Sequence, residues 1–220
     1  MIAGAIFDAD GTLLDTMPVW DNAAGMYLEG VGIAPEPGLG TILYPMSMAE
    51  GADYLIGRYG LTQSREEIVR GVGAVIEDFY FRRAQPKAGA GAFLRQLREH
   101  KIPMAVATSS DRRLVAGALR RLGLLSMFTD IFTCAQAGAG KSSPDVYHLA
   151  KRSLGTGEPR SIWVFEDALF AADTARRAGY RVAVVRDPSA DRDWKRLEQI
   201  ADYTMEDFTD FNGFYQNALK

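Results

Sequence analysis

Short apolar runs alternate with helical patterns along most of this chain, and this alternation restricts the fold more than any other feature. The intervening segments 90–100 and 111–122 each place their apolar residues on one helical face. Buried strands separated by helices predict an α/β protein with a parallel sheet covered on both sides. The five runs that have the length of a buried strand are Ala3 to Phe7, Ile102 to Thr108, Asp130 to Cys134, Ser161 to Phe165 and Tyr180 to Val185.

One segment departs from the alternation. Between about residues 17 and 83 the pattern is helical and predicts no strand; helices are expected at Val19–Val31, Ala49–Tyr59 and Ser64–Arg83. We therefore expect two domains. Residues 1–15 and 86–220 would form a Rossmann-like parallel-sheet core, and residues 16–85 an inserted, all-helical domain. The boundaries at 15–16 and 85–89 are plausible hinges, because the second contains Pro and Gly.

Composition excludes several classes of protein. Of 220 residues, 47% are hydrophobic and 24% charged, which is typical of a globular protein that can bury a core. The net charge of −3 and the lack of a basic stripe argue against a nucleic-acid partner. Cys134 is the single cysteine, so no intrachain disulfide can form.

The N-terminal apolar run does not indicate a membrane or export segment. Met1 to Phe7 is too short to cross a bilayer, and Asp8 and Asp10 follow it at once. We expect a cytoplasmic monomer without a membrane partner.

The first apolar run ends in Asp8-Ala9-Asp10-Gly11-Thr12. Two carboxylates placed two residues apart, just past a strand, can converge on one small site. Burying both without partners would be costly, so a metal ion or strong hydrogen-bond donors should lie beside them. Taken alone, the stretch could also be a simple Asp-rich turn around Gly11.

Polar groups follow three further predicted strands. Thr108-Ser109-Ser110 ends the second, Lys141 lies in the loop after the third, and Glu166-Asp167 ends the fourth. Each has an ordinary alternative: a helix cap, a solvated lysine, or an acidic helix start. Together they would gather acids, hydroxyls and a lysine at the carboxyl ends of four strands, where open α/β sheets bind ligands.

In their order and spacing, Asp8-Ala9-Asp10-Gly11-Thr12, Thr108, Lys141 and Glu166-Asp167 resemble the four signature motifs of the haloacid dehalogenase-like superfamily. The helical insert resembles the cap of its β-phosphoglucomutase-like branch. The resemblance covers nearly the whole chain. It implies a Mg²⁺-dependent phosphatase that hydrolyses a small phosphorylated metabolite through an aspartyl-phosphate intermediate.

The resemblance, together with residue chemistry, implies the catalytic roles. Asp8 would attack phosphorus as the nucleophile. Asp10 would protonate the leaving alkoxide and then take a proton from the hydrolytic water. Thr108, Ser109 and Lys141 would bind and neutralise the phosphoryl oxygens.

The same resemblance implies the metal ligands. Mg²⁺ prefers oxygen donors, and Asp8, the backbone carbonyl of Asp10, and Asp167 suit it. Glu166 would orient these ligands or their bound waters rather than ligate the metal itself.

Substrate choice is expected to depend on the cap, because the core motifs contact only the phosphoryl group. The segment 43–48 joins two predicted cap helices and carries no charge. It could enclose the leaving group, or it could be a loop internal to the cap. The residues predicted to contact substrate are Trp20, Tyr44, Met46 and Ser47.

Three positions depart from the family pattern. Ser142 follows the motif lysine where proline is usual, and Ala168 follows the acidic pair where serine is common. Neither change removes a required group. Trp20 stands where many relatives carry a histidine, which argues against a mutase activity.

Three alternatives stay open. A phosphomutase would use the same aspartyl-phosphate to phosphorylate a second sugar hydroxyl. A P-loop nucleotide binder is suggested by Ala139-Gly140-Lys141-Ser142, but the pattern needs glycine where Ala135 stands. A non-catalytic binding module on this fold is the third, although every charged group of the motifs is present.

Overall fold

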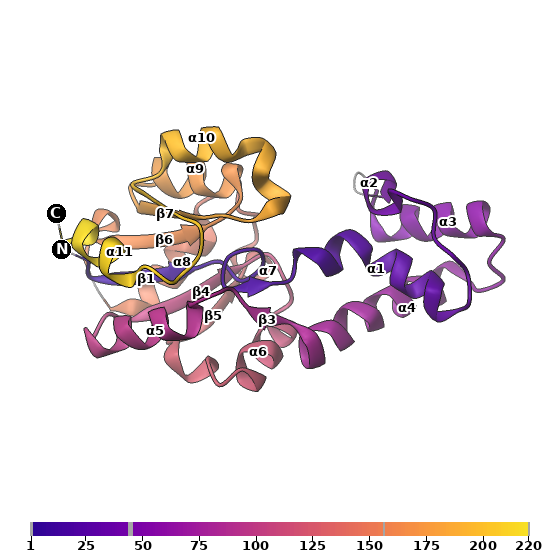
Figure 1. Ribbon diagram of the computed structural model, residues 1–220, viewed down its shortest axis with the longest axis horizontal. Helices are drawn as coiled ribbons and strands as arrows, with labels where there is room; N and C mark the ends of the chain where they lie inside the picture. Colours follow the sequence, from indigo (N-terminus) through magenta and orange to yellow (C-terminus); the bar gives the residue numbers. More distant parts are fainter. Residues whose placement is uncertain (1, 44–45, 156, 220) are drawn as a thin grey trace. The chain divides into compact units, whose positions relative to one another are not determined.

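The computed structural model describes residues 2–43, 46–155 and 157–219. The chain divides into two compact units. The first, here called the core unit, is Met1–Asp15 with Ala84–Lys220, and the second, the cap unit, is Thr16–Arg83. Figure 1 labels most of the helices and strands of both.

A six-stranded sheet forms the centre of the core unit (Figure 1), and all of its strand pairs are parallel. In space the strands follow the order β5-β4-β1-β6-β7-β8. Their bounds are Gly4–Phe7 (β1), Met104–Thr108 (β4), Ile131–Thr133 (β5), Ile162–Glu166 (β6), Arg181–Val185 (β7) and Tyr203–Met205 (β8). The predicted α/β class, with a parallel sheet and a helical insert, is confirmed.

This strand order determines where a ligand can bind. Counted along the chain, the sheet strands lie in the order third, second, first, fourth, fifth, sixth. The direction of winding therefore reverses between β1 and β6, and the carboxyl ends of the strands at such a switch point border the usual ligand site. Asp8 directly follows β1, and Glu166 is the last residue of β6.

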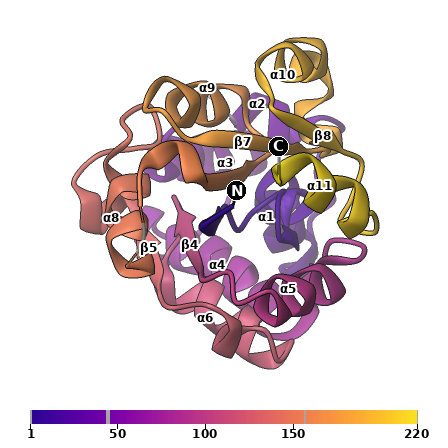
Figure 2. The ribbon, with the colours of Figure 1, turned by 90° about the vertical axis from the view of Figure 1, so that its left-hand side faces the viewer.

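Helices cover both faces of the sheet. Side chains alternate between the faces along each strand, so Ile6 and Val164 point to one side and Phe7 and Phe165 to the other. Figure 2 shows α8 and α9 on one side of the sheet, and α5 and α11 on the opposite side. The helices of the core unit are Ala90–Glu99 (α5), Arg112–Arg121 (α6), Cys134–Ala137 (α7), Asp145–Leu154 (α8), Leu169–Arg177 (α9), Trp194–Ile200 (α10) and Phe211–Ala218 (α11).

The face under α5 and α11 is aromatic. Phe7 stacks on Phe165 with ring centroids 4.3 Å apart, and Phe93 of α5 meets Phe165 edge-on at 5.6 Å. Phe214 of α11 lies 5.1 Å from Phe165. Edge-to-face and offset pairs of this kind stabilise a core beyond simple burial. They anchor the central strands β1 and β6, whose ends carry the site.

Two expectations for the core need correction. The sheet has a sixth strand, β8, which the search for apolar runs missed because only Met205 of its three residues is buried. Cys134 was expected to end a strand, but it begins α7. The Thr133 side chain accepts a hydrogen bond from the backbone N–H of Gln136, and this capping box ends the strand and starts the helix.

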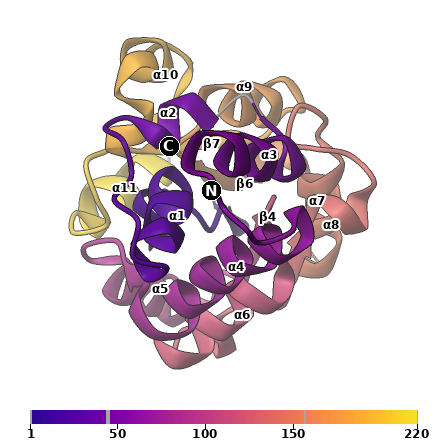
Figure 3. The same ribbon diagram turned by 90° about the vertical axis from the view of Figure 1, so that its right-hand side faces the viewer.

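The cap unit is helical throughout its described regular structure (Figure 3). Its elements are Met17–Gly30 (α1), Leu39–Leu43 (α2), Met48–Tyr59 (α3), Arg65–Asp78 (α4) and a π-helical turn, Phe79–Arg83. The helix α2 was not expected, since five residues are too few for a clear period. The helix predicted at Ser64–Arg83 starts one residue later, because Ser64 is its cap, and its final turn is π-helical.

A short antiparallel ribbon, Leu14–Asp15 (β2) with Gln85–Pro86 (β3), pairs the two chain segments next to the unit boundary. After it, Gly89 starts α5 with a φ of 75°, and a Cβ there would lie 2.5 Å from the Phe208 carbonyl carbon. Only glycine fits this close approach. Among the described residues, no helix is both long and apolar enough to cross a bilayer.

Candidate active site

The loop after β1 positions Asp8. Its backbone N–H donates to the Phe165 carbonyl of the neighbouring strand (3.0 Å), so the residue is still held by the sheet. The chain then turns back sharply: Gly11 has a φ of 77°, and the Leu14 N–H donates to the Ala9 carbonyl (2.8 Å). This left-handed position explains the glycine of the motif. Asp8 is consequently buried, with only 6% of the residue exposed.

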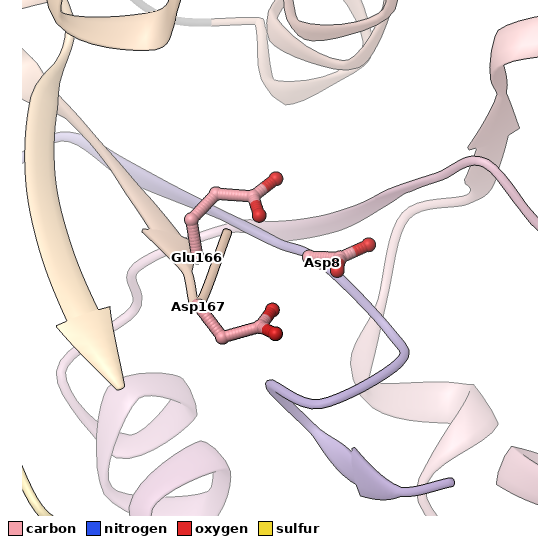
Figure 4. A group of neighbouring side chains, drawn as sticks. All are labelled: Asp8, Glu166 and Asp167. Carbon is pink, nitrogen blue, oxygen red and sulfur yellow. The ribbon is translucent and has the colours of Figure 1, made fainter. Parts of the chain in front are cut away.

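Three buried acids converge at the switch point. One carboxylate oxygen from each of Asp8, Glu166 and Asp167 lies within 4.8 Å of the others, and Figure 4 shows the three side chains beside the ends of β1 and β6. Glu166 Oε2 is buried and has no hydrogen-bond partner in the described structure. Buried charges of one sign are costly unless a cation compensates them. A hard divalent cation fits this all-oxygen donor set.

Lys141 provides one compensating charge. Its Nζ contacts Asp8 Oδ1 and lies 2.7 Å from Glu166 Oε1, and its side chain is only 4% exposed. The short helix α7 and the following loop bring it back over the sheet, where it joins the ends of β1 and β6. The predicted proximity of Lys141 to the acids is thus present in the structure.

Burial dominates the electrostatics of the acids. It raises the pKa of Asp8 well above the ordinary value; Lys141 opposes this shift, while the neighbouring carboxylates add to it. Burial, followed by the charge of Glu166, also raises the pKa of Asp167 to about 7. Asp8 and Asp167 therefore resist ionisation, and a bound cation would reverse that tendency.

Lys141 shows the opposite balance. Burial alone would lower the pKa of its ammonium group, but the adjacent carboxylates of Asp8 and Glu166 outweigh burial and raise it. The lysine consequently stays charged at neutral pH. A fixed, buried positive charge beside Asp8 is suited to neutralising an incoming phosphate group.

The end of β4 brings hydroxyl groups to the loop after β1. Thr108 is fully buried, and its Oγ1 accepts a hydrogen bond from the Ser110 N–H (3.0 Å). The Ser110 hydroxyl donates to Asp10 Oδ2 at 2.6 Å. Ser109 is exposed, and its Oγ lies 3.4 Å from Cys134 Sγ. The predicted phosphate-binding segment thus lies beside Asp10.

Two residues of the site were missed by the sequence analysis. The Thr12 hydroxyl donates to Asp167 Oδ1 (2.8 Å), and the Tyr147 hydroxyl donates to Glu166 Oε1 (2.7 Å). Thr12 lies within the first motif, so its position was a usable signal. Tyr147 carries no such signal, because its contact depends on how α8 is rotated over the sheet.

The predicted substrate-contacting residues belong to the cap unit, where the structure gives them local contacts. The Trp20 indole N–H donates to the Tyr80 hydroxyl (3.0 Å). Ser47 caps α3, and with Met46 it borders an apolar cavity of about 80 Å³ inside the cap unit. Tyr44 lies outside the described residues.

The fold and the site together define a class of protein. A parallel sheet with this strand order carries buried acids and a charged lysine at its switch point, an arrangement suited to an anionic ester and a cation. Residues 2–179 match the family described as haloacid dehalogenase-like hydrolase. The chain belongs to this family, and within it to the phosphatases, which hydrolyse phosphoric monoesters.

Individual relatives agree with this assignment. The chain is 30% identical to a protein of Drosophila melanogaster named "Probable pseudouridine-5'-phosphatase", with 94% of each chain covered. It is 29% identical to Hexitol phosphatase A of Escherichia coli, covering 90% of this chain and 88% of that one. A Thermotoga maritima structure provisionally named β-phosphoglucomutase superposes with a TM-score of 0.83 at 24% identity, covering 98% and 99% of the two chains. At that identity it supports the fold alone.

Proposed function

We propose that this protein is a Mg²⁺-dependent phosphatase that hydrolyses a small phosphorylated metabolite through an aspartyl-phosphate on Asp8. The observation that carries the proposal is the buried contact between Asp8 and Lys141, next to the acids Glu166 and Asp167. The proposed nucleophile therefore lies beside a buried positive charge and beside carboxylates that could bind a cation.

The first step transfers the phosphoryl group to the enzyme. Lys141 and Thr108 bind the phosphoryl oxygens, and an oxygen of Asp8 attacks phosphorus in line with the leaving group. The bond from phosphorus to the substrate oxygen breaks as the bond to Asp8 forms. Asp10 gives its proton to the departing alkoxide, which leaves as a neutral alcohol.

The second step restores the enzyme. A water molecule attacks phosphorus, the Asp10 carboxylate takes one of its protons, and the bond between phosphorus and Asp8 breaks. Inorganic phosphate is released, and Asp10 is again protonated for the next substrate. Dividing the reaction in this way replaces one difficult displacement by two easier ones.

The residues that would hold Mg²⁺ are Asp8 and Asp167, through one oxygen each, and Asp10 through its backbone carbonyl. When bound, the ion neutralises charge on the phosphoryl group and on the acids. Glu166 Oε1 already accepts hydrogen bonds from Lys141 and Tyr147, so its Oε2 is the atom left to orient a ligand or its water.

The substrate class is inferred from the relatives. Hexitol phosphatase A and the pseudouridine-5'-phosphatase are both named for phosphate esters of polyhydroxylated compounds. We infer a phosphorylated sugar, polyol or nucleoside for this chain. Trp20, Tyr44, Met46 and Ser47 remain the residues predicted to contact it.

The test is phosphate release from a panel of phosphorylated sugars, polyols and nucleosides, with and without Mg²⁺. Wild type is compared with Asp8→Asn and with Asp173→Asn, a matched change on the exposed face of α9. We expect Mg²⁺-dependent release from wild type and Asp173→Asn, and a loss of at least 1000-fold, as an order of magnitude, in Asp8→Asn. Equal release from both variants would contradict the proposal.

The same panel of substrates distinguishes a phosphatase from a phosphomutase, the main alternative. A phosphomutase would isomerise a sugar phosphate faster than it releases inorganic phosphate, and this is measured by chromatography of the reaction mixture. Isomerisation that exceeds release would replace the phosphatase assignment while leaving Asp8 as the nucleophile.

A further inference from the structure

The hydroxyl of Ser110 contacts Asp10, the proposed general acid. It donates to Asp10 Oδ2 at 2.6 Å, across 100 positions of sequence. This distance lies within the range of well-formed O–H···O hydrogen bonds. The contact joins the loops that follow β1 and β4, two neighbouring parallel strands.

Ser110 is itself held in place from both sides. Its N–H donates to Oγ1 of the buried Thr108, the last residue of β4. The next residue, Asp111, caps α6 by accepting a hydrogen bond from the Arg113 N–H (2.7 Å). The serine therefore lies between a strand end and a helix start, and only its single χ1 torsion remains to be fixed.

The position of the Asp10 carboxyl group matters for the proposed proton transfer. It is half-buried on a tight loop, next to Gly11 in the left-handed conformation. A general acid must come within hydrogen-bond reach of the leaving oxygen. A misplacement of about 1 Å can cost on the order of 100-fold in rate.

We propose that Ser110 is a positioning residue that holds the Asp10 carboxyl group for proton transfer to the leaving group. The inference rests on the proposed function. A hydroxyl both donates and accepts hydrogen bonds, so it can hold a carboxylate and a protonated carboxyl alike. An acid that alternates between these two forms during each turnover keeps the same partner.

The experiment compares two substrates of similar size, 4-nitrophenyl phosphate and benzyl phosphate. The first leaves as a stabilised phenolate that needs no proton, whereas the second leaves as an alkoxide that does. The measured quantity is kcat/KM with Mg²⁺ present, because it reports the steps up to and including the first phosphoryl transfer. The variants are Ser110→Ala, Ser110→Thr and Asp10→Asn.

We expect Ser110→Ala to lose roughly 10-fold to 100-fold on benzyl phosphate, and less than about 3-fold on 4-nitrophenyl phosphate. Ser110→Thr, which keeps the hydroxyl, should recover most of the loss. Asp10→Asn should also lose more activity on benzyl phosphate than on 4-nitrophenyl phosphate, and the difference should be larger than in Ser110→Ala. Ser161→Ala is the control for the substitution, since its hydroxyl donates to Glu158 at the opposite end of β6 and should leave both rates unchanged.

Equal losses on the two substrates, or no loss on benzyl phosphate, would overturn the role of Ser110. Thermal melting of each variant identifies a loss that comes from unfolding, which would lower both rates together. Failure of the proposed function looks different: wild type would not release phosphate from any ester, or Asp8→Asn would retain activity.

Discussion

The pKa values of the active-site acids in the core unit and of Glu36 in the cap unit are shifted in opposite directions. In the cap, Glu36 is bound by the exposed Arg58 (2.8 Å), and hydrogen bonds from Arg58 and Tyr54 lower its pKa to about 2. In the core, burial raises the pKa of Asp167 to about 7, although Thr12 donates to it. Exposed pairs contribute little to stability, and buried ones carry a large desolvation cost. Burial of Asp8 and Asp167 is therefore expected to cost stability, which is consistent with a chemical role for these two acids.

The largest difference between the two units is expected when the cation of an ion pair is removed. Lys141→Met should leave Asp8 and Glu166 without their buried partner, lowering the free energy of unfolding by about 3 kcal/mol and activity by roughly 1000-fold. Arg58→Met in the cap should lower the free energy of unfolding far less, because solvent screens an exposed ion pair. Urea unfolding without Mg²⁺ measures the stability of both variants. Equal losses of stability would contradict the difference expected between the buried and the exposed ion pair.

Tyr147 allows a narrower test of the core. Burial raises the pKa of Tyr147 well above its ordinary value, so its hydroxyl stays protonated and donates to Glu166. Tyr147→Phe should raise the Mg²⁺ concentration needed for half-maximal activity by roughly 10-fold. The control is Tyr180→Phe, which loses a 2.8 Å contact with His148 instead. Titrating activity with Mg²⁺ measures the concentration that gives half-maximal activation. The same shift of this concentration in both variants would mean that the effect is not specific to Glu166.

The cap contains a matched pair of serines. Ser47 and Ser64 both form capping boxes, with Glu50 and Glu67 respectively. Each Ser→Ala change should cost about 1 kcal/mol of stability. If Ser47 also contacts substrate, only Ser47→Ala should change the ranking of substrates in the phosphate-release panel. Identical rankings for the two variants would remove Ser47 from the predicted substrate contacts.

The smallest expected effect concerns pH. Asp187 is buried and accepts from Lys87 Nζ at 2.5 Å. Burial would raise its pKa, but hydrogen bonds from Lys87 and Ser189 outweigh burial and lower the pKa below 3.8. A lowered folded-state pKa gives stability that is complete above 3.8 and lost as pH falls through the folded value.

Lys87→Met should therefore be less stable than wild type at neutral pH, and the difference should shrink as the pH falls below 3.8. Urea unfolding at neutral and at acidic pH measures this. A difference that is independent of pH would show that Lys87 acts through packing of its side chain and not through Asp187.

Much of the site could be predicted because its groups follow strands. Asp8, Lys141 and Glu166 stand at or after the ends of apolar runs, and parallel strands bring their carboxyl ends to one edge. The contacts of Tyr147 and Ser110 could not be predicted in the same way. They depend on the rotation of a helix and on the approach of two loops, which hydrophobic periodicity does not specify.

The errors in the fold have a similar cause. The strand β8 buries only one of its three residues, and the helix α2 is only five residues long, too short for a period to emerge. Long, strongly periodic elements such as α6 were predicted to within about two residues. Hydrophobic patterns identify helices and strands that bury a full face. They do not identify short elements whose position depends on contacts with neighbouring elements.

The most direct test of the central claim is to capture the intermediate. Wild-type enzyme is mixed with Mg²⁺ and the best ester from the panel, quenched in acid within one turnover, and digested for mass spectrometry. The account predicts a phosphoryl group on the peptide that contains Asp8, absent from Asp8→Asn. A phosphoryl group on another residue, or turnover by Asp8→Asn, would contradict it.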